Sequence, residues 1–499
     1  MHKKIFFLLC IGIVCLFLSC LAIDYDYDLF ARLIVGEQFV EQGIIHFNDF
    51  LSYTPTHPWY DHEWGSGVIF YLFLKYLGAF GLILLQAILF FGITFFIIKT
   101  QKLQKKAYPS SLLFLTIFLI LFWKQNPTLI RCQSFSFLFF SMFLYMLEKY
   151  KKTNSNIILF IPLIVIIWNN LHGGVVSGLG LILIYLICLL IEQKPWKKLG
   201  AVLAISCPLL IINPYGVEYL KFLFSAATMN RKYITEWWHF LAYRHVLYYL
   251  PMSLYGIYGF ILTLIKTYNT REYNYTKLIV LIVTLFEGLL HVKLLSLTLI
   301  AVAALCHNEI YDSVKLIKKY LKKFEKCLYI SILIIAVTIP LYSPTNPRIE
   351  KDKYPICEIE FLKINNIKGN ILTPFGLGSY VSYKLYPSNL IYMDGRYEEV
   401  YNDTEFLKLR DFKLGESNWK EVLNNYPTEI ILATNNSISY NLLNNDNNWV
   451  LVFQGRLCGI FLKKENVKTN YIEPSYDINY YKKNAFNGYF GTKIRTMKK

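Results

Sequence analysis

Three acidic side chains and an arginine lie just after the first apolar run of the chain. Asp24, Asp26 and Asp28 alternate with tyrosines, and Arg32 follows Asp28 by one helical turn. Two carboxylates held close together near a membrane surface repel each other and lose some hydration, so the pKa of at least one of them rises. Such a pair suits a general base or a divalent cation, which would take Asp26 and Asp28 as its ligands. Arg32 is placed to pair with Asp28 or with a phosphate group.

A second group of ionisable residues, Asp61, His62 and Glu63, lies between Trp59 and Trp64. The two tryptophans by themselves are typical of a membrane interface. Consecutive ionisable groups are costly near lipid, so this segment either faces a water-filled cavity or lies among the lipid headgroups. Three adjacent residues cannot all bind one zinc ion with good geometry, and no H-E-x-x-H motif occurs, so a zinc protease is excluded.

Polar residues also fall at the outward-facing ends of later apolar runs. The cationic candidates among them are Arg131, His172 and Arg231. Each of these alone is more often a helix cap or an interface anchor. Three further acids of the first loop are expected to be solvated: Glu37, Glu41 and Asp49. Acids in the first loop and cations elsewhere suit an anionic lipid substrate, so the residues alone predict an outward-facing membrane enzyme or a binder of a phosphate-bearing lipid.

The composition places these residues in a polytopic membrane protein. Of the 499 residues, 55% are hydrophobic and only 17% are charged, a balance that soluble domains rarely show. The net charge of +17 would fit a nucleic-acid binder, but the lysines recur in short segments between apolar runs, as the positive-inside rule requires. The first run, 5–23, is long enough to span a bilayer core of ~30 Å. A cleaved signal peptide ending near Cys20 is the alternative, and both interpretations place Asp24 outside the cytoplasm.

The later apolar runs predict a bundle of membrane helices. Spans are expected near 79–98, 110–123, 133–147, 156–168, 174–191, 199–213, 246–265, 276–288, 290–306 and 328–342. The stretch 276–306 is compatible with one long helix or two short ones. The alternating lysine-rich connections put the N-terminus in the cytoplasm and the C-terminus outside. The sequence therefore predicts a transmembrane domain over 1–342 with about eleven helices and a first outer loop over 24–66.

The chain becomes polar from residue 343 onward. Strands are predicted for NILTPF, NLIYMDGR, EIILAT, WVLVFQG and CGIFLKK, with helical segments between them. This alternation predicts a small extracytoplasmic α/β domain over 343–466, followed by a flexible polar tail over 467–499. Cys357 and Cys458 lie in this domain, away from the apolar runs. They could form one disulfide or remain two free thiols, and the sequence leaves both alternatives open.

These motifs resemble the GT-C membrane glycosyltransferases, which include the protein O-mannosyltransferase and aminoarabinose transferase types. The segment from Asp26 to Trp64 is similar to the D-x-D-L-W-W-H-L, D-x-F-S-Y-T and W-x-x-H-E-W-L motifs of the bacterial RgtA/B/C/D-like subgroup. IRCQSFSFLFF, WNNLHGGVVSGL, INPYGVEYL, YITEWW and LYPSNLIYMDGR resemble later motifs of that subgroup. The resemblance covers most of the chain and ends near Lys464.

The resemblance implies a polyprenyl-phosphate sugar donor, inversion of the anomeric centre and an early acid of the first outer loop as catalytic base. Asp28 matches that acid, and Asp26 would orient the acceptor or help to hold a cation. Candidates to stabilise the leaving phosphate are Arg131, His172 and Arg231. His62 and Glu63 would bind the sugar or the acceptor, or support the first loop. The resemblance leaves open whether catalysis requires a divalent cation.

The chain departs from the family pattern where Phe30, Ala31 and Arg32 replace W-W-H, so recognition of the donor or acceptor is expected to differ. A proline of the pattern is also replaced, by Cys132. The expectation is an integral glycosyltransferase of the cell inner (plasma) membrane that moves a sugar to an extracytoplasmic lipid, glycan or protein. Two alternatives stay open: a transporter or flippase for lipid-linked sugars, and a noncatalytic protein that binds or assembles envelope glycans.

Overall fold

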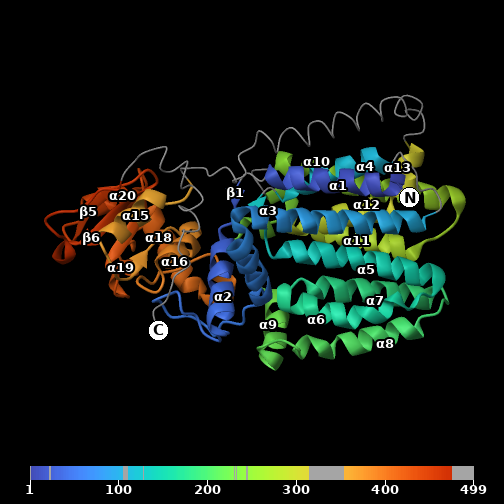
Figure 1. Ribbon diagram of the computed structural model, residues 1–499, viewed down its shortest axis with the longest axis horizontal. Coiled ribbons are helices and arrows are strands. Elements are labelled where there is room, and N and C mark those ends of the chain that lie inside the picture. The colour runs from blue at the N-terminus through green and yellow to red at the C-terminus, as the bar shows by residue number, and fades with distance from the viewer. Residues whose placement is uncertain are drawn as a thin grey trace. The chain divides into compact units, whose positions relative to one another are not determined.

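The chain divides into two compact units, shown in the computed structural model of Figure 1. The helical unit comprises Met1–Ala22 and Ile83–Thr345, and the mixed unit comprises Ile23–Leu82 and Asn346–Lys499. The structure describes residues 2–21, 24–104, 111–126, 128–229, 231, 233–242, 246–313 and 353–474. The predicted first outer loop, 24–66, therefore folds with the C-terminal part of the chain, whereas the sequence grouped it with the transmembrane domain.

The helical unit consists mainly of apolar helices, and some of the connections between them contain short 3-10 turns. Its α-helices are α1 (His2–Cys20), α4 (Ser111–Gln125), α5 (Gln133–Thr153), α6 (Ile161–Leu171), α7 (Val175–Ile191), α8 (Lys197–Ser206), α9 (Gly216–Thr228), α10 (Val246–Thr270), α11 (Tyr275–Leu290), α12 (Leu295–Leu305) and α13 (His307–Ser313). The 3-10 turns are η1 (Asn156–Phe160), η2 (Pro208–Ile211), η3 (Thr235–Trp237), η4 (Phe240–Ala242) and η5 (Val292–Leu294). Helix α3 (Trp64–Leu103) begins in the mixed unit, is interrupted by non-helical backbone at Gly78, and ends in the helical unit.

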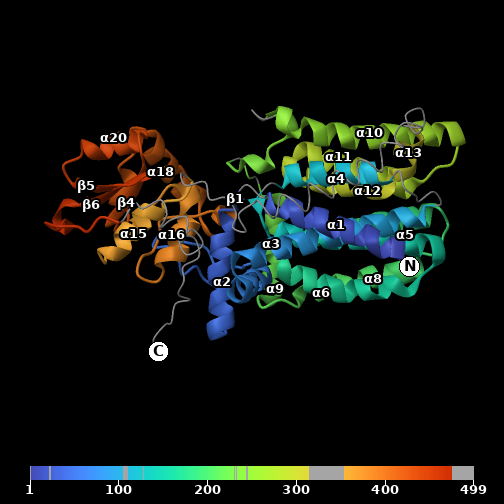
Figure 2. The ribbon, with the colours of Figure 1, turned by 45° about the horizontal axis from the view of Figure 1, so that its top comes forward.

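Helix α12 lies at the centre of the helical unit, because all of its residues except Leu297 are buried. A helix that is apolar on all sides needs neighbours on all sides, and α12 packs against α4, α5, α10 and α11. Helices α5, α6, α7 and α8 pack against one another and lie side by side in Figure 1, and Figure 2 shows the same unit turned by 45°. The outer faces of these helices expose large apolar side chains, among them Leu163, Ile167, Leu183 and Ile187. Such faces are typical of helices that contact lipid.

Two helices among the described residues, α3 and α10, are long and apolar enough to cross a membrane. A third span results if Lys197–Ile211 and Gly216–Ala226, which are bent by 108° at a short break, are taken as one. Several shorter apolar helices accompany them. The stretch 276–306 forms two helices, α11 and α12, which resolves the choice that the sequence left open. The predicted span near 328–342 lies outside the described residues, and the count of about eleven spans stays a prediction.

The mixed unit is built around a four-stranded sheet in the order β3-β4-β6-β5, in which β3 runs parallel to β4 and the other pairs are antiparallel. Its strands are β3 (Ile371–Leu372), β4 (Ile430–Thr434), β5 (Trp449–Gln454) and β6 (Cys458–Lys463). Its other helices and turns are α2 (Asp28–Gln42), α15 (Ile356–Ile364), η6 (Phe375–Leu377), α16 (Gly378–Leu385), α17 (Tyr397–Val400), α18 (Asp403–Leu414), α19 (Glu421–Asn424), α20 (Ile438–Asn444) and η7 (Lys464–Asn466). Four of the five predicted strands are thus confirmed.

The fifth predicted strand, NLIYMDGR, pairs with its neighbours only through isolated bridges, and one of these brings in the first loop. Ile391 bridges Ile371 of β3 and, in parallel, Ser52 of the first loop. The amide of Tyr53 donates to the carbonyl of Ile391 at 3.1 Å, and the amide of Ile391 donates to the carbonyl of Leu51 at 2.9 Å. Because backbone pairing with the C-terminal part continues into the first loop, the two segments form one folded unit.

Two further predictions concern the C-terminal part. Cys357 and Cys458 are both buried free thiols, so the alternative of two free thiols holds in this structure. Of the predicted tail, 467–499, the structure describes residues up to 474, and these follow η7 without regular secondary structure.

Candidate functional site

The paired acids of the first loop begin helix α2. Asp28 is the first residue of the helix, and the backbone amide of Asp28 donates to Oδ1 of Asp26 at 3.0 Å. Asp26 is buried, with 9% of its surface exposed. By accepting this amide, the carboxylate of Asp26 holds the first residue of the helix in place. Asp28, an acid in the first turn, interacts favourably with the helix dipole. Asp26 therefore positions Asp28.

The carboxylate of Asp28 lies directly against the backbone of Gly395 in the D-G-R motif. A Cβ atom at position 395 would overlap Oδ1 of Asp28 and lie 3.5 Å from its Cγ. Glycine leaves the space that the carboxylate occupies. The structure therefore brings together two motifs, D-x-D and D-G-R, that are more than 360 residues apart in the sequence.

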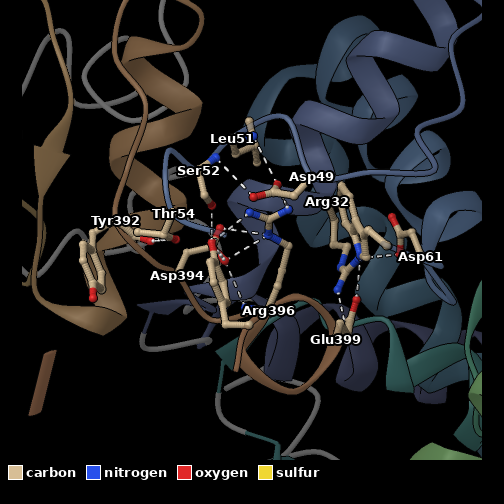
Figure 3. A network of polar contacts seen from close by, with 12 residues as sticks. Arg32, Asp49, Leu51, Ser52, Thr54, Asp61, Tyr392, Asp394, Arg396 and Glu399 are labelled. Atoms are coloured by element: carbon tan, nitrogen blue, oxygen red, sulfur yellow. Dashed lines mark hydrogen bonds and ion pairs between the residues drawn. The ribbon is translucent and has the colours of Figure 1, made fainter. Parts of the chain in front are cut away.

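Arg32 lies one turn further along α2 and is buried, with a 3% exposed side chain. Its guanidinium group contacts Asp61, Glu63 and Glu399; the contacts to Oε2 of Glu63 and Oε1 of Glu399 are both 2.8 Å. The structure thus pairs Arg32 with three carboxylates of the mixed unit. Figure 3 shows two of them, Asp61 and Glu399, and Glu399 is 367 positions away in the sequence. A guanidinium engaged in this way ties the first loop to α17.

Asp61 is the most deeply buried acid of this cluster, with a side chain that is 1% exposed. Burial raises the pKa of Asp61 to about 6; the charge of Arg32 opposes this rise, while the charges of Glu399 and Glu63 add to it. His62 lies beside the same acids, with Nδ1 3.5 Å from Glu399 and Nε2 3.6 Å from Glu63. The predicted residues Arg32, His62 and Glu63 therefore share one polar cluster.

Two glycines allow Arg32 to reach this cluster. Gly36 on α2 and Gly67 at the start of α3 face each other so closely that a Cβ atom at either position would overlap backbone atoms of the other helix. A Cβ at position 36 would also stand 2.9 Å from Cβ of Tyr71. The two helices can therefore cross with their backbones in contact, which brings Arg32 against the turn that precedes Trp64.

A second buried network surrounds Arg396 of the D-G-R motif. Its Nε donates to both carboxylate oxygens of Asp394 at 2.9 and 3.0 Å, and its Nη1 contacts Oδ1 of Asp49 at 2.7 Å (Figure 3). All three side chains are at most 1% exposed. Asp49 also accepts the amides of Leu51 and Ser52 at 3.1 Å each. The prediction that Asp49 is a solvated loop residue is wrong, because this acid anchors the loop segment that pairs with Ile391.

Trp59 connects the two networks. Its indole N–H donates to Oε2 of Glu399 at 3.0 Å. The guanidinium of Arg396 lies 4.5 Å from its ring centroid, and that of Arg32 lies 5.9 Å away. A buried indole between two guanidinium groups supplies cation–π contacts to both. Trp59 is fully buried, so it belongs to the core of the mixed unit rather than to an interfacial belt.

The remaining predicted residues belong to the helical unit. Nη1 of Arg131 pairs with Glu236 at 2.7 Å, and Arg231 stacks 4.3 Å from the ring centroid of Trp237. Lys293 lies 3.8 Å from Glu236 and 5.4 Å from the same ring. Arg131 and Arg231 are thus gathered, together with Lys293, around the E-W pair of YITEWW.

His172, the third predicted cation of the helical unit, has a separate set of contacts. Its Nδ1 accepts the amide of Gly174 at 2.9 Å and lies 2.8 Å from the hydroxyl of Ser136. Ser136 in turn accepts the indole N–H of Trp168 at 2.7 Å. Accepting a backbone amide at Nδ1 orients the ring and leaves Nε2 as its second polar atom.

Asp49 and Glu399 belong to these clusters but were not selected as site residues from the sequence. Asp61 was grouped with His62 and Glu63 but was given no role of its own. The D-G-R segment by itself predicts a turn with an Asp–Arg pair, with acceptor recognition as the alternative, and the structure contains that pair. Glu399 had no signal of its own, because it follows the motif in an ordinary acidic stretch, YEEVY.

No protein-family model matches the chain, and no curated protein matches it significantly. The geometry and chemistry of the residues therefore carry the functional argument.

Proposed function

We propose that the protein is an integral-membrane glycosyltransferase of the GT-C type. It transfers a sugar from a polyprenyl-phosphate donor to an extracytoplasmic lipid, glycan or protein acceptor. The proposal includes a bundle of about eleven membrane spans with the N-terminus in the cytoplasm, as the lysine distribution predicts. The membrane-compatible helices α3 and α10 support it.

The placement of Asp28 is the observation that carries the proposal. Asp26 holds the start of α2 through the amide of Asp28, and Gly395 leaves room for the Asp28 carboxylate. The buried networks of Arg32 and Arg396 fix the segments on either side. A carboxylate held on rigid elements in this manner is what a general base requires, since proton transfer depends on geometry first.

The other residues take supporting roles in this proposal. Arg131 and Arg231, with His172, stabilise negative charge on the departing polyprenyl phosphate. His62 and Glu63 support the loop or contact the sugar or acceptor. Arg32, which stands where the related pattern has histidine, ties the loop to Glu399, so its pairing favours a structural role over phosphate binding.

The test is a turnover assay with the full chain in lipid nanodiscs. A panel of polyprenyl-phosphate sugars is supplied with an envelope extract as acceptor, and mass spectrometry follows the release of free polyprenyl phosphate. Asp28→Asn is expected to lower the rate by about 10²–10⁴-fold, the range typical of a lost general base. Asp411→Asn serves as the matched control, because Asp411 lies on α18 and pairs with its neighbour Arg410 at the surface.

Unchanged turnover in a folded Asp28→Asn protein would remove Asp28 from the mechanism. Saturable donor binding without any release of polyprenyl phosphate would favour the noncatalytic binding protein. Movement of the intact donor across the bilayer of proteoliposomes would favour the flippase.

A further inference from the structure

Asp61, His62 and Glu399 form a compact set of metal-binding side chains in the mixed unit. Each offers one ligand atom, and these atoms all lie within 4.8 Å of one another. Asp61 and His62 come from the turn before α3, and Glu399 comes from α17. Adjacent residues of one turn supply two ligands here, while the third comes from a segment more than 330 residues away.

Among the residues that the structure describes, the ion pairs place three carboxylates, Asp61, Glu63 and Glu399, on one guanidinium. Asp61 and Glu399 are 1% and 8% exposed, and both form ion pairs with the guanidinium of Arg32, which Glu63 also contacts. In the described part of the neighbouring network, Arg396 lies between two carboxylates of its own, so its charge does not offset those of this set. Buried carboxylates that exceed their cations are stabilised by binding a further cation or a proton.

One oxygen of this set has no hydrogen bond among the described residues. Oδ1 of Asp61 accepts from Arg32 and from the amide of Glu63, the latter at 2.9 Å. Oδ2 of Asp61 is buried and makes no hydrogen bond within the described ranges. A buried carboxylate oxygen normally has a polar partner, so this atom is available to bind a cation.

The contacts around the set are those that orient metal ligands. Glu399 accepts the indole N–H of Trp59 at 3.0 Å through the oxygen that does not face Arg32. His62 presents Nδ1 to Glu399, while its other ring nitrogen faces the carboxylate of Glu63 at 3.6 Å. A ligating histidine commonly has a carboxylate at its second nitrogen, and ligating carboxylates are themselves hydrogen-bonded.

We propose that Asp61, His62 and Glu399 bind one divalent transition-metal ion such as Mn²⁺ or Zn²⁺. An imidazole with two carboxylates suits these ions better than Ca²⁺ or Mg²⁺, which take oxygen ligands almost alone. The ion clamps the turn before α3 to α17. His62 and Glu63, at 18% and 14% exposure, form the open edge through which the ion enters.

This site differs from the cation site that the sequence suggested at Asp26 and Asp28. It also does not depend on the proposed transferase activity, because its test measures binding. Failure of one proposal therefore leaves the other standing.

The experiment titrates Mn²⁺ into the full chain in nanodiscs after chelator treatment, with electron paramagnetic resonance reporting free Mn²⁺. The wild type is expected to bind one ion that Zn²⁺ displaces. His62→Gln and Glu399→Gln are expected to weaken binding by at least tenfold. Asp28→Asn, which tests the alternative site, and Glu421→Gln, an exposed matched control, are expected to bind like the wild type.

A second measurement guards against variants that fail to fold. Binding to the native state alone raises the melting temperature with ligand concentration, so Mn²⁺ should stabilise the wild type and Glu421→Gln but not His62→Gln. His62 is partly exposed, so His62→Gln is expected to keep the fold. The proposal is overturned if the wild type binds no ion, if His62→Gln and Glu399→Gln bind normally, or if only Asp28→Asn loses binding.

Discussion

Replacing Arg396 by methionine should destabilise the edge of the mixed unit selectively. The variant keeps a side chain of similar length but leaves the carboxylates of Asp49 and Asp394, which are 1% and 0% exposed, without their cation. Removing one partner of a buried ion pair costs about 3–5 kcal/mol. A difference of about 1.4 kcal/mol is tenfold in an equilibrium constant, so local opening should become roughly 10² to 4 × 10³ times more frequent.

Hydrogen–deuterium exchange with mass spectrometry measures this local opening directly. The amides of Tyr53 and Ile391, which bond across the first loop and the C-terminal part, should exchange about 10² to 4 × 10³ times faster in Arg396→Met. Amides of α12 in the helical unit serve as the internal control. The double variant Arg396→Met with Asp49→Asn removes one uncompensated charge and should recover part of the loss, with a coupling of about 0.5–3 kcal/mol. Exchange that changes less than about fivefold, or a double variant that is worse than the single one, would refute the reasoning.

Three other predictions follow from the same contacts. Gly395→Ala places a Cβ onto the Asp28 carboxylate and should lower turnover by the proposed transferase at least about tenfold. Gly180→Ala, with no atom within 4 Å of its Cβ, should leave turnover unchanged. Equal turnover in both variants would contradict the proposed position of the base. Gly36→Ala forces apart two helices in backbone contact and should lower stability by about 1–3 kcal/mol or more, measured by thermal unfolding; an unchanged melting temperature would speak against the close crossing. Burial opposes ionisation of Asp49, but its arginine partner and the loop amides outweigh burial and hold its pKa below the usual range. The stability that Asp49 contributes is therefore present above its unfolded pKa of about 3.9 and is lost as the pH falls through the lower folded value. Acid unfolding below about pH 4 should be shallower in Asp49→Asn, and an identical pH profile would show that the carboxylate is not held by its partner.

Local patterns in the sequence were sufficient for much of the fold. The apolar segments EIILAT, WVLVFQG and CGIFLKK predicted β4, β5 and β6, because β-branched and aromatic residues in short runs bounded by polar turns favour strands. The apolar stretches at 133–147, 156–168 and 174–191 predicted α5, α6 and α7, because apolar runs of more than ten residues favour buried helices. The segment NLIYMDGR was expected to be a strand, yet it pairs only through single bridges, because its end turns to form the Asp394–Arg396 contact.

The site was predicted only in part. Asp26, Asp28, Arg32, His62 and Glu63 lie in one unit, since all fall within a single loop, and their roles stay predictions. Their partners could not be selected. Arg32 contacts Glu399 across 367 positions of sequence, and Asp28 lies against Gly395 at a similar separation. No periodicity or motif spacing encodes a contact over that distance.

By itself, the sequence determined the apolar helices, the short strands, the lysine-rich connections and the presence of acids after the first apolar run. These features depend on residue type and on neighbours a few positions away. The tertiary structure alone decided that the first loop folds with the C-terminal part, that Asp49 is buried rather than solvated, and that Arg32 binds carboxylates from both ends of the chain. The physical reason is that burial of a charge requires a partner, and the partner is chosen by packing in space rather than by proximity in sequence.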